Sequence, residues 1–417
     1  MMMRNLTVKI LGAGLAWCGL VVLPHPAVAS PHFSRQYEIS CAVCHSAGPK
    51  LNRAGEAFIH RGLLLPHWDE ITTTDTRDPE IKLPKALPLS IRTQAYARVR
   101  RGETLDLQTA SAVANADYDI QAPYTLDLVG GTALTSNVSM RFNATLADRG
   151  ITPHPPFERA IFTYTGLLGA AVIGQFPISD ILFSRHQRLT VQDYLPYDLA
   201  GLGNERGVLF NLDLVYGGLT LGASNGNGTQ TSTALNSPGL GRSDRLFDNN
   251  NVKDYFARVG LDTDVINGGL FMLIGERPNA AENMQITRTV SGVDGNLAIA
   301  DRFYLYGQAL MVRWEDFQRT SVADTWYGGF IGMDYIANAG SSFSLLYNYV
   351  NAGTLATAAN IYRGIGTNTI TANASHYFAR NVRGVIEITT DFLLKDTAQY
   401  GHNNKEDYFL VGLDLTF

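Results

Sequence analysis

The feature that most constrains the fold is an alternation of apolar and polar residues, which recurs in segments of about ten residues from Leu87 to Phe417. Successive side chains of a strand point to opposite faces, so this period of two predicts strands with two different faces. In the last segment one face carries Phe409, Val411, Leu413, Leu415 and Phe417, and the other carries Tyr408, Leu410, Gly412, Asp414 and Thr416. A terminal strand with an apolar, lipid-facing side is typical of an outer-membrane β-barrel.

The pattern divides the chain into an even number of strands. We predict about sixteen, near 88–100, 122–133, 136–147, 157–165, 168–175, 206–215, 218–225, 253–262, 267–275, 285–298, 302–313, 325–336, 341–351, 365–378, 381–394 and 405–417. Short joins, such as Gly166–Leu167 and Tyr216–Gly217, alternate with long connections, such as 101–121 and 226–252. Bacterial barrels have short periplasmic turns and long outer loops, so we expect a mainly β fold, an antiparallel transmembrane barrel over 87–417.

The N-terminus carries the pattern of an export signal, predicted for residues 1–29. Arg4 and Lys9 precede an apolar run from Ile10 to Leu23, and the small-residue site Ala27–Ala29 follows. The run is about 14 residues long, whereas a membrane-spanning helix needs about 20. We therefore predict a cleaved signal peptide and no transmembrane helix.

Composition and net charge limit the kinds of partner that the protein can bind. The chain is 45% apolar and 17% charged, which is not the composition of a disordered protein. Its formal net charge of -5 becomes -7 without Arg4 and Lys9, and there is no basic run. Nucleic acid is therefore not expected as a partner.

Cys41, Cys44 and His45 form the spacing Cys-x-x-Cys-His. Two thiols at this spacing reach both vinyl groups of one porphyrin, and the adjacent histidine binds the iron, so the motif predicts one covalently bound haem c. A thioredoxin-like redox pair would need a βαβ unit around it, and a zinc site would need two more ligands nearby. The flanking residues favour neither alternative.

The motif does not identify the sixth ligand of the iron. No methionine lies between Met3 and Met140, so the haem segment cannot supply a His/Met pair by itself. His67, after Pro66, and His60 are the tentative distal ligands, with His67 preferred. His32, a barrel residue and an open position are the remaining alternatives.

The predicted haem segment, residues 30–86 with its linker, is short and helical. One face of the expected helix after the motif carries Leu51, Ala54, Gly55, Phe58 and Gly62, while His60 points away. About fifty residues are too few for an ordinary independent cytochrome core. We expect the segment to enter the barrel from the periplasmic side and to use the lumen as its wall.

The residues around the motif carry a resemblance: Phe33-Ser34-Arg35-Gln36, Pro49-Lys50-Leu51-Asn52, Gly55, Phe58 and Gly62. With them the chain resembles the fused monohaem cytochrome-porins of iron-oxidising bacteria. The resemblance implies an outer-membrane iron oxidase that takes electrons from extracellular Fe(II) and passes them to a soluble periplasmic cytochrome. Within the resemblance, Cys41, Cys44 and His45 match the haem-binding residues of the family.

The predicted function is therefore electron transfer across the outer membrane, from Fe(II) outside to a periplasmic carrier. The alternatives are another donor, outward electron flow, and a diffusion porin with an accessory haem plug. A haem peroxidase would need a distal acid-base residue, and no recognisable spacing marks one. The loop 176–205 could fold inward as a constriction, whichever of these functions the barrel has.

Oxygen-rich ligands suit a surface Fe(II) site. The expected outer loops carry Glu103, Asp106, Asp117, Asp119, Glu282, Glu315, Asp316 and Asp324. Loop carboxylates more often only solvate a loop or bind divalent ions that bridge lipopolysaccharide.

Overall fold

The structure is a computed structural model. It describes residues 31–417 except 79, 102–103, 106–111, 114–117, 152, 154–155, 230–233, 237–242, 246, 249–251, 264, 280–283, 301, 316–323, 339, 352–365 and 393–406. The predicted signal peptide, 1–29, lies outside the described residues. No helix in the described ranges is long and apolar enough to span a bilayer.

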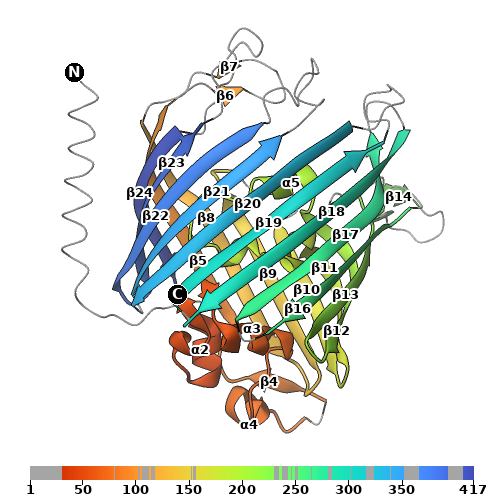
Figure 1. Cartoon of the computed structure of the whole chain (residues 1–417). Coiled ribbons are helices and arrows are strands. Elements are labelled where there is room, and N and C mark those ends of the chain that lie inside the picture. Colours follow the sequence, from red (N-terminus) through yellow and green to blue (C-terminus); the bar gives the residue numbers. More distant parts are fainter. Residues whose placement is uncertain are drawn as a thin grey trace.

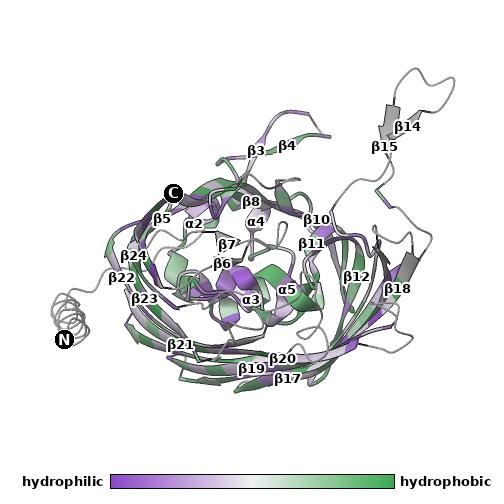
Figure 2. Ribbon diagram, turned by 90° about the horizontal axis from the view of Figure 1, so that it is seen from above, coloured by the Kyte–Doolittle hydropathy of each residue, from purple (hydrophilic) through white to green (hydrophobic). Residues whose placement is uncertain are grey.

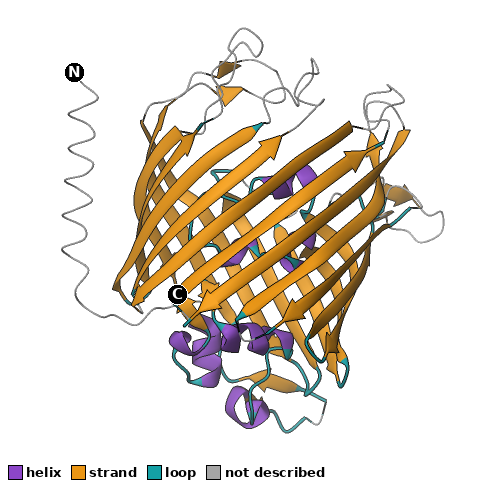
Figure 3. Ribbon diagram, viewed as in Figure 1, coloured by secondary structure: helices purple, strands orange, loops and turns teal. Residues whose placement is uncertain are grey.

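Sixteen antiparallel strands close into one barrel, and the last strand pairs with the first (Figures 1 and 3). They are β5 (Leu89–Arg101), β8 (Tyr118–Ala133), β9 (Val138–Asp148), β10 (Phe157–Gly166), β11 (Gly169–Pro177), β12 (Asn204–Leu214), β13 (Gly217–Ser224), β16 (Asp254–Asp262), β17 (Ile266–Asn279), β18 (Met284–Ile299), β19 (Phe303–Trp314), β20 (Asp324–Asn338), β21 (Ser341–Asn351), β22 (Thr367–Ala379), β23 (Val382–Asp391) and β24 (Asp407–Thr416). The predicted strand number and order are confirmed. Two short ribbons, β6 (Thr104–Leu105) with β7 (Ala112–Val113) and β14 (Ala234–Asn236) with β15 (Ser243–Arg245), belong to long connections.

The two faces of the strands separate as the alternation predicts. On β24, Val411 and Leu413 are exposed on the outside, whereas Leu410 and Asp414 are buried inside. The outward apolar residues form the surface that lipid would contact, and the inward residues pack against the contents of the lumen.

The connection between β11 and β12, residues 178–203, folds into the lumen (Figure 2), and we call it the lumen loop. It contains η2 (Ile178–Ile181), η3 (Arg185–Gln187) and α5 (Pro196–Ala200). Tyr194 stacks on Phe330 of β20 with ring centroids 4.2 Å apart and an interplanar angle of 11°. The prediction of an inward-folding loop is confirmed.

The N-terminal segment packs at the barrel end that carries the short turns and the C-terminus (Figure 1). Its elements are α2 (Pro31–Tyr37), η1 (Cys41–Val43), β1 (His45–Ala47), β2 (Lys50–Leu51), α3 (Arg53–His60), α4 (Trp68–Thr72), β3 (Thr73–Asp75) and β4 (Lys82–Pro84). Its own buried apolar cluster is small and centres on Tyr37, Phe58 and Leu63. The predicted helix after the cysteine motif is α3, with Gly55 and Phe58 buried as expected.

Candidate functional site

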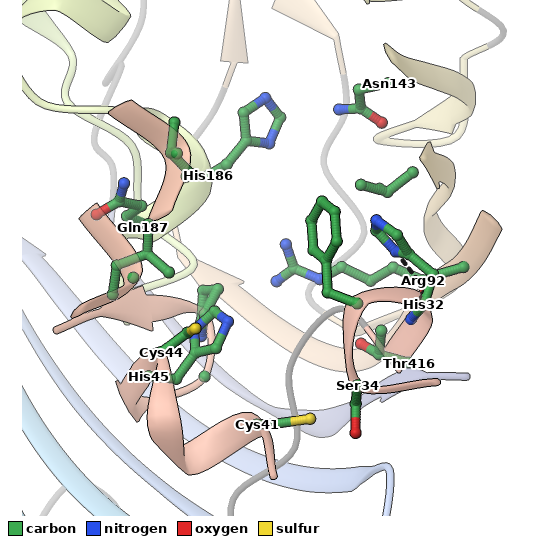
Figure 4. Close-up of a pocket in the computed structure, with 18 of the residues that line it drawn as sticks. His32, Ser34, Cys41, Cys44, His45, Arg92, Asn143, His186, Gln187 and Thr416 are labelled. Carbon is green, nitrogen blue, oxygen red and sulfur yellow. Dashed lines mark hydrogen bonds between the residues drawn. The ribbon is translucent and has the colours of Figure 1, made fainter. Parts of the chain in front are cut away.

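The segment and the barrel enclose one pocket between them, with an empty volume of about 1370 Å³ including its open mouth. The structure brings Cys41, Cys44 and His45 together at this pocket (Figure 4). Residues of six barrel strands complete the wall, among them Ser90, Arg92, Val129, Arg141, Phe142, Arg159, Tyr377 and Asp414. Neither the segment nor the barrel would form this pocket alone.

Asn52 fixes the loop that carries the two thiols. Its side-chain Oδ1 caps α3 by accepting the Gly55 N–H at 3.0 Å, and its Nδ2 donates to the Val43 carbonyl at 3.1 Å. Its backbone N–H donates to the carbonyl of Cys44 at 3.0 Å. Cys41 and Cys44 are half-buried and are not joined in a disulfide, and burial raises the pKa of the Cys44 thiol.

Close packing explains two further residues of the motif region. A Cβ on Gly55 would lie 2.2 Å from the Cys44 carbonyl oxygen, so α3 can approach the cysteine loop at this position because the residue is glycine. Phe58 meets the rings of Phe33 and Tyr37 edge-on, at centroid distances of 5.1 Å and 5.5 Å. These contacts hold α2, α3 and the cysteine loop as one unit.

His45 lines the pocket directly after the second thiol. Its Nδ1 is buried and has no hydrogen-bond partner. Burial lowers the pKa of its imidazole to about 4, although hydrogen bonds to the backbone of Pro49 and Lys50 act in the opposite direction. The ring is therefore neutral near pH 7, which is the form that binds a metal.

His32 also lines the pocket, from α2. Its side chain is completely buried, and its Nδ1 lies 2.8 Å from Oγ of Ser90 on β5. Its Nε2 is buried without a partner. Burial, together with the charges of Arg35 and Arg141, lowers the pKa of this imidazole to about 3.

The two tentative distal ligands lie elsewhere. His60 is 47% exposed and its Nε2 lies 3.3 Å from Asp213, whereas His67 is 76% exposed and its Nδ1 lies 3.9 Å from Glu70. Neither lines the pocket. One sequence signal points to His32 instead. Pro31 is suited to the first turn of a helix, and in that helix His32 and Gln36 lie one turn apart on the buried face.

Three arginines, Arg92, Arg141 and Arg159, and two aspartates, Asp127 and Asp414, line the barrel wall of the pocket. Arg92 pairs with Asp414 at 2.8 Å, and Arg159 pairs with Asp180 of the lumen loop. Arg141 has no ion-pair partner within 4.0 Å among the described residues. The pocket can therefore accept carboxylate groups on this side.

Lys50 anchors the segment to the opposite wall. Its Nζ lies 2.6 Å from Oδ2 of Asp334 on β20, and it sits over the ring of Tyr304 at 4.4 Å. Ser46 Oγ lies 2.7 Å from the Tyr304 hydroxyl, and Arg383 donates to the Gly48 carbonyl at 3.0 Å. These contacts hold the segment against β19, β20 and β23 of the barrel.

A second, polar cavity adjoins the pocket inside the barrel, and its volume of about 1230 Å³ includes the open space at its mouth. Arg92, Asp127 and His186 line both cavities. The second cavity continues along the lumen loop, where Asp148, Asp193 and Asp198 face Arg149, Arg185 and Arg188.

Within the described part of the chain no cluster of three or more His, Cys, Asp or Glu side chains is arranged to hold a metal ion. Of the predicted surface carboxylates, Asp119, Glu315 and Asp324 are described. Glu103, Asp106, Asp117, Glu282 and Asp316 lie outside the described residues.

The fold is that of an outer-membrane porin: a closed, sixteen-stranded antiparallel barrel with a loop folded into its lumen. An anion-selective porin from Comamonas acidovorans is 12% identical, with a TM-score of 0.54, over 79% of this chain and 98% of that one. A loop L8 deletion mutant of OmpT, an outer membrane protein of Vibrio cholerae, is 10% identical, with a TM-score of 0.51, over 79% and 98% of the two chains. Salmonella typhi OmpF in complex with daunomycin is 14% identical, with a TM-score of 0.51, over 79% and 97%.

At these identities the likeness establishes the fold and nothing further. No protein-family model and no curated protein matches the sequence.

Proposed function

We propose that this protein is an outer-membrane barrel that carries one haem c in its periplasmic mouth and transfers electrons across the membrane. The observation that carries the proposal is the pocket itself: Cys41, Cys44 and His45 line it from one side, and barrel residues line it from the other. Cys41 and Cys44 would hold the porphyrin covalently, and His45 would be the proximal iron ligand.

The residues present fit that group. Neither cysteine is in a disulfide, and the Nδ1 of the adjacent histidine is buried without a hydrogen-bond partner. Apolar side chains suited to a porphyrin face line the pocket, among them Phe33, Ile39, Leu51, Phe58, Val129 and Phe142. Arg141, which has no ion-pair partner within 4.0 Å among the described residues, suits a carboxylate of the haem edge. When bound, the haem iron supplies one-electron chemistry between its ferric and ferrous states.

The position of the pocket favours transfer across the membrane. It lies at the barrel end with short turns, which is periplasmic in bacterial barrels, and a soluble periplasmic cytochrome would accept the electron there. The polar cavity that shares Arg92 and His186 with it extends into the lumen, where a small hydrated donor fits better than a protein. The resemblance of the cysteine region points to extracellular Fe(II), which loses one electron and leaves as Fe(III).

A diffusion porin with an accessory haem plug is the second candidate, and the likeness to porin structures favours it. Against it, the lumen loop buries Tyr197 and Leu202 completely inside the barrel. The N-terminal segment also covers one end of the barrel.

The first test is haem attachment. The full-length protein would be expressed with a haem c maturation system, and the covalent haem measured by the pyridine haemochrome spectrum and by the protein mass. We expect one haem per chain, and none in Cys41→Ser/Cys44→Ser. A wild-type chain without haem would overturn the proposal.

The second test is vectorial transfer in proteoliposomes that contain an entrapped cytochrome c as acceptor. External Fe(II) should reduce the entrapped acceptor, while Mn(II) should not, and the cysteine variant should be inactive. Permeability to small sugars is measured on the same vesicles. Fast sugar uptake without acceptor reduction would favour the porin.

A further inference from the structure

We propose that His32 is the sixth ligand of the iron, so that two histidines, His45 and His32, bind it from opposite sides. This inference rests on the proposed haem. Figure 4 shows His45 beside Cys44 on one side of the pocket and His32 on the other. Both line the same cavity, and each has a buried ring nitrogen without a partner.

Ser90 fixes the His32 ring through two contacts. Its Oγ lies 2.8 Å from Nδ1 and accepts the backbone N–H of His32 at 3.0 Å. An oxygen with two lone pairs can accept from both nitrogens, which leaves the Nε2 lone pair free to bind iron. Histidine ligands commonly have their second nitrogen fixed in this way.

A purely structural role explains His32 less well. A completely buried imidazole whose Nε2 has no hydrogen bond is costly, because an unsatisfied buried polar atom destabilises a fold. An apolar residue would fill the same space without that cost. A bond from Nε2 to iron would remove the cost of the unsatisfied nitrogen.

The other candidates are placed less well. His60 and His67 are exposed and lie outside the pocket. His186 lines the pocket, but its Nε2 is engaged by Glu158 Oε2 at 2.9 Å. No methionine occurs among the described residues of the pocket wall, so the structure offers no His/Met pair.

The assignment has a consequence for the donor. With both His45 and His32 as ligands, the iron would have no position left for a substrate or for peroxide. The donor would then transfer its electron without forming a bond to the metal. The ligand is also tied to the barrel, because Ser90 belongs to β5, the first barrel strand.

The test uses full-length, haem-loaded protein and three single variants: His32→Ala, His60→Ala and His67→Ala. Electron paramagnetic resonance and near-infrared magnetic circular dichroism identify bis-histidine ligation and the spin state. We expect a low-spin bis-histidine spectrum in the wild type, in His60→Ala and in His67→Ala. His32→Ala should become high-spin and bind carbon monoxide in the ferrous state, and added imidazole should restore the low-spin spectrum.

The outcomes separate the two proposals. A wild type without covalent haem contradicts the proposed function. A haem-loaded His32→Ala that keeps the low-spin bis-histidine spectrum overturns the His32 assignment and leaves the proposed function standing. If His32→Ala does not fold, Ser90→Ala decides: the assignment expects a larger high-spin fraction and faster carbon monoxide binding, and an unchanged spectrum overturns it.

Discussion

The Nζ of Lys50 lies 2.6 Å from Oδ2 of Asp334, and this pair joins the N-terminal segment to the barrel wall where both side chains are nearly out of contact with water. The lysine is 14% exposed and the aspartate 1%. The rings of Tyr304 and Tyr306 lie under the ammonium group at 4.4 Å and 4.7 Å. Lys50 therefore contributes to docking both as an ion and as a cation over aromatic faces.

Lys50→Ala should loosen the docked segment strongly. The substitution leaves the Asp334 carboxylate buried without its partner, and breaking a buried pair in this way costs about 3–5 kcal/mol. We expect limited trypsin digestion to release the segment much faster than in the wild type. The matched control is Lys82→Ala, which removes an exposed pair with Asp69 in the same segment and should change the rate little. If trypsin released the segment equally fast from both variants, the burial of the Lys50–Asp334 pair would not explain the docking.

The Gly55→Ala substitution should impair haem attachment. Its Cβ would stand 2.2 Å from the Cys44 carbonyl oxygen, so α3 or the cysteine loop must move. We expect a severalfold lower haem content per chain, measured by the pyridine haemochrome spectrum. Gly203→Ala is the control, because a Cβ there has nothing within 4 Å. Normal haem content in Gly55→Ala would show that the thiols do not need this packing.

The barrel was predictable because its signal is local. A strand with one lipid-facing side repeats every two residues, so β24 is visible in ten residues of sequence without any knowledge of its partners. Cys41, Cys44 and His45 were predictable as a motif for the same reason. The structure adds the enclosing wall, which comes from strands far along the chain.

The sequence favoured His67 over His60 and left His32 among the alternatives, because the contacts of His32 are not local. What distinguishes His32 is its contact with Ser90, which is 58 residues away in sequence and faces it because α2 packs on β5. No local spacing encodes that contact. The pairing of Lys50 with Asp334, 284 residues apart, was equally invisible, although Lys50 was noticed within its motif.

Arg141→Gln should lower the reduction potential of the haem. Arg141 lines the pocket and has no ion-pair partner within 4.0 Å in the described part of the chain. Removing a positive charge makes the gain of an electron less favourable, and about 1 kcal/mol corresponds to roughly 40 mV for one electron. A spectroelectrochemical titration measures the shift. Lys85→Gln, an exposed charge in the linker, should leave the potential unchanged, and an unchanged potential in Arg141→Gln would remove this residue from the haem environment.

We expect Asp193 to make the position of the lumen loop sensitive to acid. It is 5% exposed, and its carboxylate lies 3.4 Å from Arg188, 3.6 Å from Arg185 and 3.7 Å from Arg149. Burial alone would raise the pKa of Asp193, but the three arginines outweigh it and hold this pKa at about 2. Because the folded value lies below that of a free aspartate, the ionised group stabilises the docked loop above about pH 4. That contribution is lost as the pH falls through about 2.

We therefore expect the conductance of the barrel in planar bilayers to rise between about pH 4 and pH 2, as the loop loosens. The contribution at stake is on the order of 2 kcal/mol. Asp193→Asn should show the raised conductance already at pH 7 and lose the step. Asp198→Asn, which removes an exposed partner of Arg185, should keep the step, because its carboxylate is already largely solvated. A wild-type step that survives in Asp193→Asn would assign the acid response to another group.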